Sequence, residues 1–179
     1  MATIPSRYLI DTNVLLRYAN RAQPLHTVVR TSINQLRAQE HHLYMSSQNC
    51  IEFWNVVTRP VNRNGFGFLP EDVDATLGWL ELAFPLLADT PAIYTEWRQL
   101  YFALNENRSF GQGRNSGSHH NRSIVAQYNV SGVQVHDARL VAIMRVNQLS
   151  HLLTFNTKDF TRYHSVGFVT VDPLQMSEM

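Results

Sequence analysis

Short apolar segments alternate along this chain with longer segments in which apolar residues recur at helical spacing. The short segments are typical of buried strands, because they span only a few residues and are bounded by turn-forming or charged residues. We expect strands at Tyr8–Ile10, Leu43–Met45, Phe84–Leu87, Leu152–Thr154 and Gly167–Val171. Parallel strands need a crossover connection, usually a helix, whereas antiparallel strands can be joined by short turns. The alternation therefore predicts an α/β fold with a mainly parallel sheet.

The helical segments begin at capping residues or at prolines, which favour helix starts. We expect helices from Val14, from Leu25 to Leu36 with Pro24 at the helix start, from Ser46 or Ser47 to Arg59, from Pro70, from Thr90–Pro91, and from Asp137. The last of these is apolar around much of its circumference, which predicts that it is the most deeply buried helix.

The helix that begins at Ser46 or Ser47 carries an apolar stripe and a polar face. The stripe consists of Cys50, Phe53, Trp54 and Val57, and the polar face of Gln48, Glu52, Asn55 and Arg59. Residues three and four apart share one side of a helix, so we expect the stripe to be buried and Glu52 to point away from the core.

Length and composition indicate a globular protein. The chain has 179 residues, of which 44% are hydrophobic and 16% charged, so we expect a single domain over residues 1–179. Cys50 is the only cysteine, which excludes an intramolecular disulfide and fits a cytoplasmic location. Residues 1–7 contain no apolar stretch of signal-peptide length and no run approaches a membrane span, so we expect no membrane partner.

One region departs from this globular pattern. Residues 105–123 are rich in glycine, asparagine and serine, which predicts a flexible insertion. No acidic residue occurs from Asn107 to His136, whereas Arg108, Arg114 and Arg122 do. This local basic charge is typical of RNA contact, but loops also tolerate added residues at small entropic cost. Both interpretations stay open, because the net charge of +1 does not decide between them.

Four acidic residues lie where helices meet strands. Asp11 follows the first strand, Glu52 lies on a polar helix face, Asp137 opens an apolar helix, and Asp159 follows the strand that ends at Thr154. In open parallel sheets, ligands bind outside the carboxyl ends of the strands. Carboxylates gathered there repel unless a cation neutralises them, and oxygen ligands suit Mg²⁺ or Mn²⁺. Such an ion can activate a water, which points to phosphodiester hydrolysis.

Each acid also has an ordinary interpretation. Asp11 and Asp137 can cap or electrostatically stabilise the helices that they precede, and Asp159 can form a turn. Glu52 can be a solvated helix residue. Taken singly these interpretations are favoured, whereas taken together they leave the order and context of the acids unexplained.

The segments around the acids, taken as a set, resemble a known family. They are Leu9–Asn13, Glu52 on its helix, His136–Ala142 and Leu153–Phe160. They are similar to the acidic motifs of PIN-domain ribonucleases, in particular the VapC-like toxins of type II toxin–antitoxin systems. The resemblance implies a three-layer α/β/α sandwich with a central, mainly parallel sheet. It also implies a metal-dependent endoribonuclease that cleaves RNA, is bound by a small cognate antitoxin, and forms a homodimer.

The resemblance also implies roles for individual residues. Asp11 and Asp137 would be the metal ligands and Glu52 a further catalytic acid. Either Asp159 or Asn156 would complete the site. Metal ligands are generally held by neighbouring hydrogen-bonding groups, so we expect Thr12 and Asn13 to hold Asp11.

The sequence departs from the family pattern at the insertion, which interrupts the helix that contains Trp97. The insertion is compatible with an RNA-contacting arm, with disturbed dimerisation, or with a degenerate copy. The alternative function is therefore a catalytically silent RNA-binding or partner-binding module. A phosphatase with an aspartyl nucleophile needs a second aspartate where Asn13 stands, which disfavours that class. The pairs His41–His42 and His119–His120 have no further ligands at zinc-site spacing and are interpreted as loop histidines.

Overall fold

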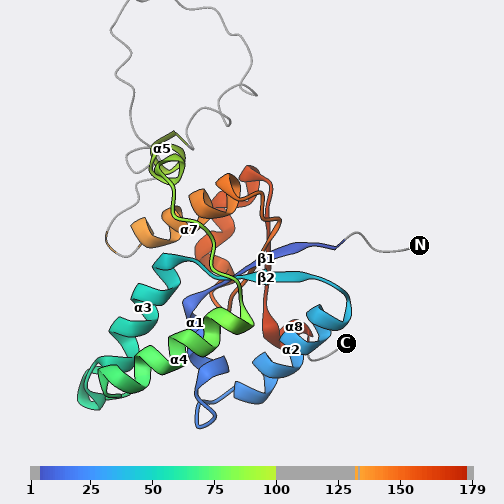
Figure 1. Cartoon of the computed structure of the whole chain (residues 1–179). Helices are drawn as coiled ribbons and strands as arrows, with labels where there is room; N and C mark the ends of the chain where they lie inside the picture. Colours follow the sequence, from blue (N-terminus) through green and yellow to red (C-terminus); the bar gives the residue numbers. More distant parts are fainter. Residues whose placement is uncertain (1–4, 100–131, 133, 177–179) are drawn as a thin grey trace, which may run out of the picture.

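The computed structural model describes residues 5–99, 132 and 134–176. Within these residues, four strands form one all-parallel sheet in the order β2-β1-β3-β4 (Figure 1). The strands are β1 (Arg7–Ile10), β2 (His42–Tyr44), β3 (His151–Leu153) and β4 (Val169–Val171). The predicted parallel sheet is confirmed, because four of the five predicted apolar segments form its strands.

The fifth predicted strand, Phe84–Leu87, is wrong. Only Leu86 pairs there, through an isolated parallel bridge to Met45. Phe84 is still the C-cap of the preceding helix and donates its backbone N–H to Leu80. Pro85 has no N–H to donate, so the segment cannot continue the ladder beyond one bridge.

Helices cover both faces of the sheet. In the described part of the chain they are α1 (Thr12–Ala19), α2 (His26–Ala38), α3 (Ser47–Thr58), α4 (Pro70–Ala83), α5 (Pro91–Gln99), α7 (Gln134–Val146) and α8 (Pro173–Met176), together with the 3-10 helices η1 (Val61–Arg63) and η3 (Thr157–Val166). No described helix has the length and apolar character that a membrane span requires.

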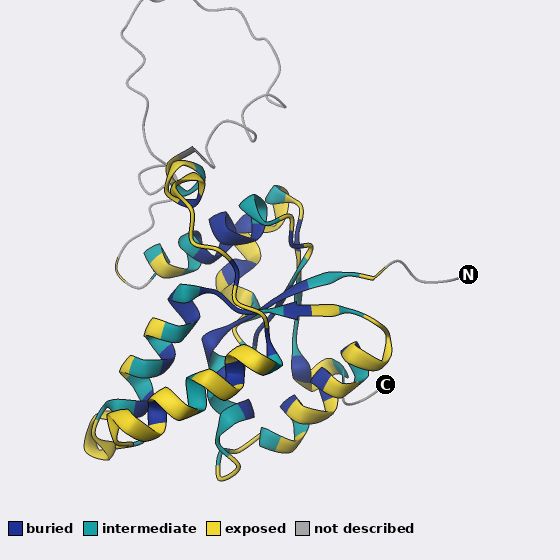
Figure 2. Ribbon diagram, in the orientation of Figure 1, coloured by how far each residue is buried: buried dark blue, intermediate teal, exposed yellow. Residues whose placement is uncertain are grey.

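Successive strand residues face opposite sides of the sheet and enter separate cores. Leu9 and Leu152 pack with residues of α5, α7 and η3, whereas Ile10 and Leu153 pack with residues of α1, α2, α3 and α4. Buried residues accordingly concentrate on the strands and on the helix faces turned toward them (Figure 2). The predicted three-layer α/β/α sandwich is confirmed.

The predicted buried stripe of α3 is wrong for two of its four residues. Phe53 and Val57 are buried as expected, but Cys50 and Trp54 are only half-buried. Gln48 and Asn49, which are polar, are buried in their place. The helix begins after Ser46, whose backbone and side chain both hydrogen-bond to Asn49 in a capping box. The hydrogen-bonding needs of the polar first turn therefore set which face is buried.

Helix starts also differ from the prediction. Leu25 adopts a left-handed conformation with φ of 68° directly before α2, so Pro24 lies outside the helix. The first residue of α7 is Gln134, which follows Gly132 at φ of +56°. Asp137 therefore lies in the first turn of α7 and does not open it.

Several predictions fall on residues 100–131 and 133, which lie outside the described part of the chain. They are the insertion at about 105–123, the RNA contacts of Arg108, Arg114 and Arg122, the pair His119–His120, and the continuation of α5 toward Leu104.

Two leucines on α4 test the packing directly. Leu80 is fully buried and Leu82 is 88% exposed. We expect Leu80→Ala to lower the free energy of unfolding by about 2–5 kcal/mol, because it removes buried methyl groups and leaves a cavity. Leu82→Ala is the matched control and should change it by less than about 0.5 kcal/mol. Urea denaturation measures both, and equal effects would contradict the packing described.

Candidate functional site

Four acidic residues lie on elements around the carboxyl edge of the sheet. Asp11 follows β1, Glu52 lies on α3, Asp137 on the first turn of α7, and Asp159 on η3. The charges of Asp11, Asp159 and Glu52 all raise the pKa of Asp137, so each of these three carboxylates is within electrostatic reach of Asp137. The structure thus brings together acids that are far apart in the sequence.

Strand pairing places Asp11 beside Thr154. Ile10 of β1 is in register with Leu153 of β3, and the ladder continues as the Asp11 backbone N–H donates to the Leu153 carbonyl at 3.0 Å. The next residue of each strand therefore leaves the sheet at the same point. Thr154 is completely buried there and Asp11 is 7% exposed.

Asp11 occupies the N-cap position of α1, but its side chain makes no capping hydrogen bond. Its Oδ2 instead accepts hydrogen bonds from Thr154 Oγ1 and from Asn13 Nδ2, both at 2.6 Å. Asp11 is thus the N-cap residue of α1 by position, and its carboxylate is also held by side chains from α1 and from the end of β3. The expectation that Asn13 holds Asp11 agrees with this contact.

Burial raises the pKa of Asp11 to about 6, against a model-compound value of 3.8. The hydrogen bond from Thr154 acts against this rise, because it stabilises the charged form, whereas the negative charge of Glu52 adds to it. Asp11 is thus mostly ionised at neutral pH and takes up a proton at a higher pH than an ordinary aspartate does.

Thr154 is a site residue that the sequence reasoning missed. Its hydroxyl donates to Asp11, and it accepts hydrogen bonds from the Asn156 backbone N–H and from Asn13 Nδ2, each at 3.0 Å. The sequence pattern could have indicated Thr154, because it follows the apolar residues of β3 just as Asp11 follows those of β1. Polar residues that directly follow two neighbouring parallel strands lie side by side.

Glu52 is held by both of its carboxylate oxygens. Oε2 accepts a hydrogen bond from Thr12 Oγ1 at 2.6 Å, and Oε1 accepts one from Gln48 Nε2 at 2.8 Å. The His136 ring nitrogen Nδ1 lies 3.7 Å from Oε1. The Thr12 hydroxyl thus donates to Glu52, whereas Thr12 acts on Asp11 through its backbone, which lowers the pKa of that carboxyl. That hydroxyl is in turn held by Asn49 Nδ2 at 3.2 Å.

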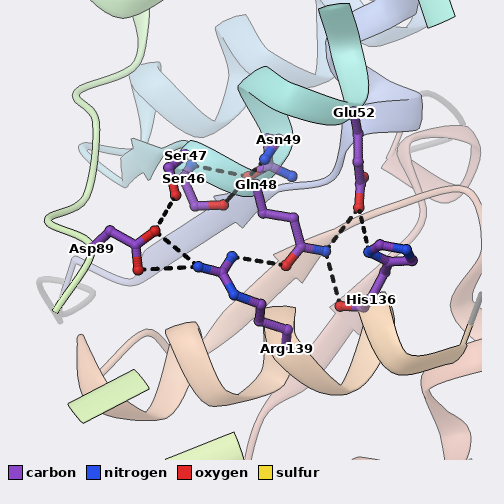
Figure 3. Close-up of polar contacts among 8 residues, drawn as sticks. All are labelled: Ser46, Ser47, Gln48, Asn49, Glu52, Asp89, His136 and Arg139. Atoms are coloured by element: carbon purple, nitrogen blue, oxygen red, sulfur yellow. Dashed lines mark hydrogen bonds and ion pairs between the residues drawn. The ribbon is translucent and has the colours of Figure 1, made fainter. Parts of the chain in front are cut away.

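Gln48 connects α3 to α7 (Figure 3). Its side-chain nitrogen donates both to Glu52 and to the backbone carbonyl of His136, at 2.8 and 3.0 Å. Its side-chain oxygen accepts a hydrogen bond from Arg139 Nη1 at 3.1 Å. The side chain is buried, and these bonds use both of its polar atoms. Gln48 therefore fixes the orientation of Glu52 relative to the start of α7.

Arg139 is anchored on its other side by Asp89. Its Nη2 lies 3.0 and 2.8 Å from the two carboxylate oxygens, and Ser47 Oγ donates to the same carboxylate at 2.6 Å (Figure 3). The hydrogen bond from Ser47 and the contact with Arg139 lower the pKa of Asp89. We call Gln48, Arg139 and Asp89 the bridging chain. No sequence motif indicated it.

Asp137 is half-buried, and its pKa is raised to about 7 from 3.8. Desolvation is the largest cause, followed by repulsion from Asp11, Asp159 and Glu52. The positive charge of Arg162 opposes these effects. A large part of the Asp137 population therefore carries a proton at neutral pH when no cation is bound.

Asp159 and Asn156 are both exposed at the start of η3. Asn156 precedes the first turn, and its backbone carbonyl accepts a hydrogen bond from the Asp159 N–H at 3.0 Å. Asp159 acts on Asp137 through its charge, whereas the hydrogen bond from Asn156 to Thr154 involves only its backbone.

The donor chemistry of the site suits a hard divalent cation. All four candidate donors are carboxylates, and two of them, Asp11 and Asp137, have pKa values raised first by burial and further by neighbouring negative charge, which a cation would offset. Within the described residues, no group of three or more His, Cys, Asp or Glu side chains is arranged to enclose a metal ion. Mg²⁺ commonly binds through one or two carboxylates and keeps several waters, so Asp11 and Asp137 fit this ion without a closed cage.

Comparison with known proteins identifies the fold. No protein-family model and no curated protein matches the sequence. Among solved structures, VapBC2 from Rickettsia felis, bound to a DNA fragment from its promoter, is similar at a TM-score of 0.59 and 12% identity, over 93% of this chain and 98% of that one. VapBC-1 from nontypeable Haemophilus influenzae gives 0.56 and 17%, over 94% and 98%.

VapC20 from Mycobacterium tuberculosis, described as a toxin that cleaves the sarcin-ricin loop, gives a TM-score of 0.51 and 15% identity over 92% of this chain and 98% of that one. At these identities the likeness concerns the fold. The chain has the PIN-like α/β/α fold of these proteins, with its four acids at the carboxyl edge of the parallel sheet.

The raised pKa of Asp137 predicts a pH dependence of stability. Its proton is bound more tightly in the folded state, with a pKa of about 7, than at the ordinary value of 3.8. Its contribution to the free energy of unfolding is therefore complete below pH 3.8 and is lost as the pH rises through about 7. We expect Asp137→Asn to lose less stability than the wild type over this range, in urea titrations without divalent cations.

Asp89→Asn is a control variant for which the opposite pH dependence of stability is expected. The pKa of Asp89 is lowered in the folded state, so its contribution is present at neutral pH and is lost as the pH falls. Stability profiles of the wild type and Asp137→Asn that run parallel from acid to neutral pH would contradict the electrostatics described here.

Proposed function

We propose that this protein is a metal-dependent endoribonuclease of the VapC-like kind, the toxin of a toxin–antitoxin pair. One observation carries the proposal: Asp11 and Asp137, which are 126 positions apart by their numbers, lie close enough for the charge of Asp11 to raise the pKa of Asp137. A pair of repelling carboxylates in a partly desolvated site is stable in charged form only beside a cation. The PIN-like fold supports the same chemistry by analogy.

Asp11 and Asp137 would hold Mg²⁺ or Mn²⁺. When bound, such an ion neutralises charge on a phosphate and lowers the pKa of a coordinated water. Asp11 is suited to this role because Asn13 and Thr154 restrict its rotation through one oxygen, Oδ2. Glu52 is oriented through both of its oxygens and would accept the proton of the attacking water as a general base.

Asp159 is the better candidate for the fourth acid. Its charge acts on Asp137, and the side chain is exposed and accessible to a substrate. Arg162 follows Asp159 by three positions and lies close enough to lower the pKa of Asp137. We propose that its guanidinium would contact a substrate phosphate. Its Nη1 donates to Gln134 Oε1 at 3.1 Å, which holds the guanidinium near the first turn of α7.

The partners follow from the same proposal. We propose a small cognate antitoxin, because the similar Rickettsia and Haemophilus structures are of VapBC pairs. We also propose a homodimer in the cytoplasm, as the resemblance of the acidic motifs implies. We further propose that residues 1–179 form one domain and that the insertion at about 105–123, with Arg108, Arg114 and Arg122, contacts RNA. Co-expression with a short reading frame next to the gene should relieve growth inhibition if an antitoxin is encoded there.

Cleavage of RNA tests the catalytic proposal. We expect Asp11→Asn and Asp137→Asn to abolish Mg²⁺-dependent cleavage of a mixed RNA pool, because each removes a ligand charge. Glu52→Gln should reduce the rate by about a hundredfold or more, because it removes the proton acceptor. Asp74→Asn, an exposed change on α4, is the matched control and should leave cleavage unchanged.

Circular dichroism and gel filtration establish that each variant is folded. Undiminished cleavage by both aspartate variants would defeat the mechanism. RNA binding by a wild-type protein that neither cleaves RNA nor binds Mn²⁺ would support the silent-module alternative instead.

The bridging chain gives a separate prediction. Gln48→Met retains the length of the side chain but removes both of its hydrogen-bonding atoms. Glu52 then loses one of its two hydrogen-bond donors. Loss of such an orienting contact typically costs 10–100-fold in activity or metal affinity, by the general behaviour of supporting residues, so we expect about this reduction in cleavage rate. RNA affinity should stay at the wild-type level. An unchanged rate would show that Gln48 does not position Glu52.

A further inference from the structure

A surface pocket, which we call the hollow, lies between the carboxyl end of α1, the start of α2 and the middle of α4, and none of the four acids lines it. Its volume is about 350 Å³, and the side chains that matter for its chemistry are Tyr18, Arg21, His26, Arg30 and Trp79. None of these side chains contacts the four acids in the hydrogen bonds and ion pairs of the described residues. The catalytic proposal therefore leaves the hollow unexplained.

One wall of the hollow is an aromatic stack. The rings of Tyr18 and Trp79 lie 5.2 Å apart at an interplanar angle of 11°. Tyr18 is buried and also packs edge-on against Phe84 at 5.0 Å, so the stack is anchored in the core. Trp79 is 44% exposed. An exposed indole on a rigid support is a surface on which a further planar group can stack.

The rest of the hollow is basic. Arg21 and Arg30 are exposed, and the Arg30 guanidinium lies 5.6 Å from the centre of the Tyr18 ring. The described residues that line the hollow include no aspartate or glutamate. Within the same part of the chain, neither arginine forms an ion pair with an acidic side chain. The hollow thus combines unneutralised positive charge with an exposed aromatic face.

We infer that this hollow binds a nucleotide of single-stranded RNA outside the cleavage site, with the base on Trp79 and the flanking phosphates at Arg21 and Arg30. Aromatic stacking beside a basic track is how proteins hold single strands without reading their sequence. An acidic peptide would use the arginines but gain little from the indole, so the stack favours a nucleotide. The inference rests on the proposed function for its choice of RNA.

The position of the hollow fits one continuous substrate. Helix α1 begins directly after Asp11 and reaches Tyr18 in its last turn, which corresponds to about 10 Å along the helix axis. An RNA strand that spans both places would have to cover at least this distance, which corresponds to a few nucleotides. The site would then act as an anchor that adds affinity and leaves the chemistry to the acids.

The test measures RNA binding without cleavage. Fluorescence anisotropy of a labelled, short single-stranded RNA of mixed sequence is recorded in EDTA, with all substitutions made in the full chain. We expect Trp79→Ala to weaken binding by at least about fivefold, the lower end of the loss for one stacked base. Arg21→Ala and Arg30→Ala should each lower the slope of log K against log salt by about 0.7.

Matched controls separate the site from general effects. Leu82→Ala removes an exposed apolar side chain from the same helix, and Arg63→Ala removes an exposed arginine from η1, so both should bind RNA as the wild type does. Trp79→Phe keeps an aromatic ring and should retain most of the affinity. It should also lose the quenching of tryptophan fluorescence that the stacked base causes in the wild type.

Equal RNA affinity of Trp79→Ala and Leu82→Ala overturns the inference, as does a poly-glutamate peptide whose binding, unlike that of RNA, depends on Arg21 and Arg30. Neither result touches the proposed cleavage, which is assayed separately with Mg²⁺. Conversely, a protein that fails to cleave RNA but shows the expected losses of binding keeps the inference and refutes the catalytic proposal.

Discussion

The structure of the site depends on the parallel pairing of β1 with β3. Their register sets Ile10 opposite Leu153, so the two residues that leave these strands, Asp11 and Thr154, emerge side by side. The pairing buries the Asp11 carboxylate and at the same time supplies its hydrogen-bond donor. A slip by one residue would turn Leu153 to the opposite core and separate the pair, so packing on both faces of the sheet protects the geometry of the acid.

Asp11 and Glu52 are held by separate sets of hydrogen bonds. Asp11 is held by groups at the ends of the strands, Asn13 and Thr154, whereas Glu52 is held by Thr12 and by Gln48 of its own helix. The bridging chain then links α3 to α7, which carries Asp137. The attraction within this chain helps to hold together helices whose carboxylates repel, and this gives Arg139 and Asp89 a structural role.

Much of the fold was predictable because apolar residues recur with different spacing in strands and in helices. In addition, consecutive parallel strands need a crossover connection, which is usually a helix. The acids could be proposed as a cluster because parallel strands end at one edge. Polar side chains were harder to predict: Asn49 is buried by the capping box, and Thr12 donates to Glu52 because α1 and α3 pack together. The contact of Gln48 with Arg139 joins residues 91 positions apart, and Arg139 meets Asp89 across 50 positions. Such contacts depend on tertiary packing, which the spacing of hydrophobic residues along the chain does not specify.

The central claim is that Asp11 and Asp137 share one site, in which a bound cation favours the charged form of both. Calorimetric titration with Mn²⁺ tests it most directly, at a pH between their pKa values of about 6 and about 7 and in buffers of different ionisation enthalpy. The account predicts that binding releases protons, because a bound cation lowers both pKa values, and that Asp11→Asn abolishes this binding. Mn²⁺ binding without proton release, or undiminished binding by Asp11→Asn, would contradict it.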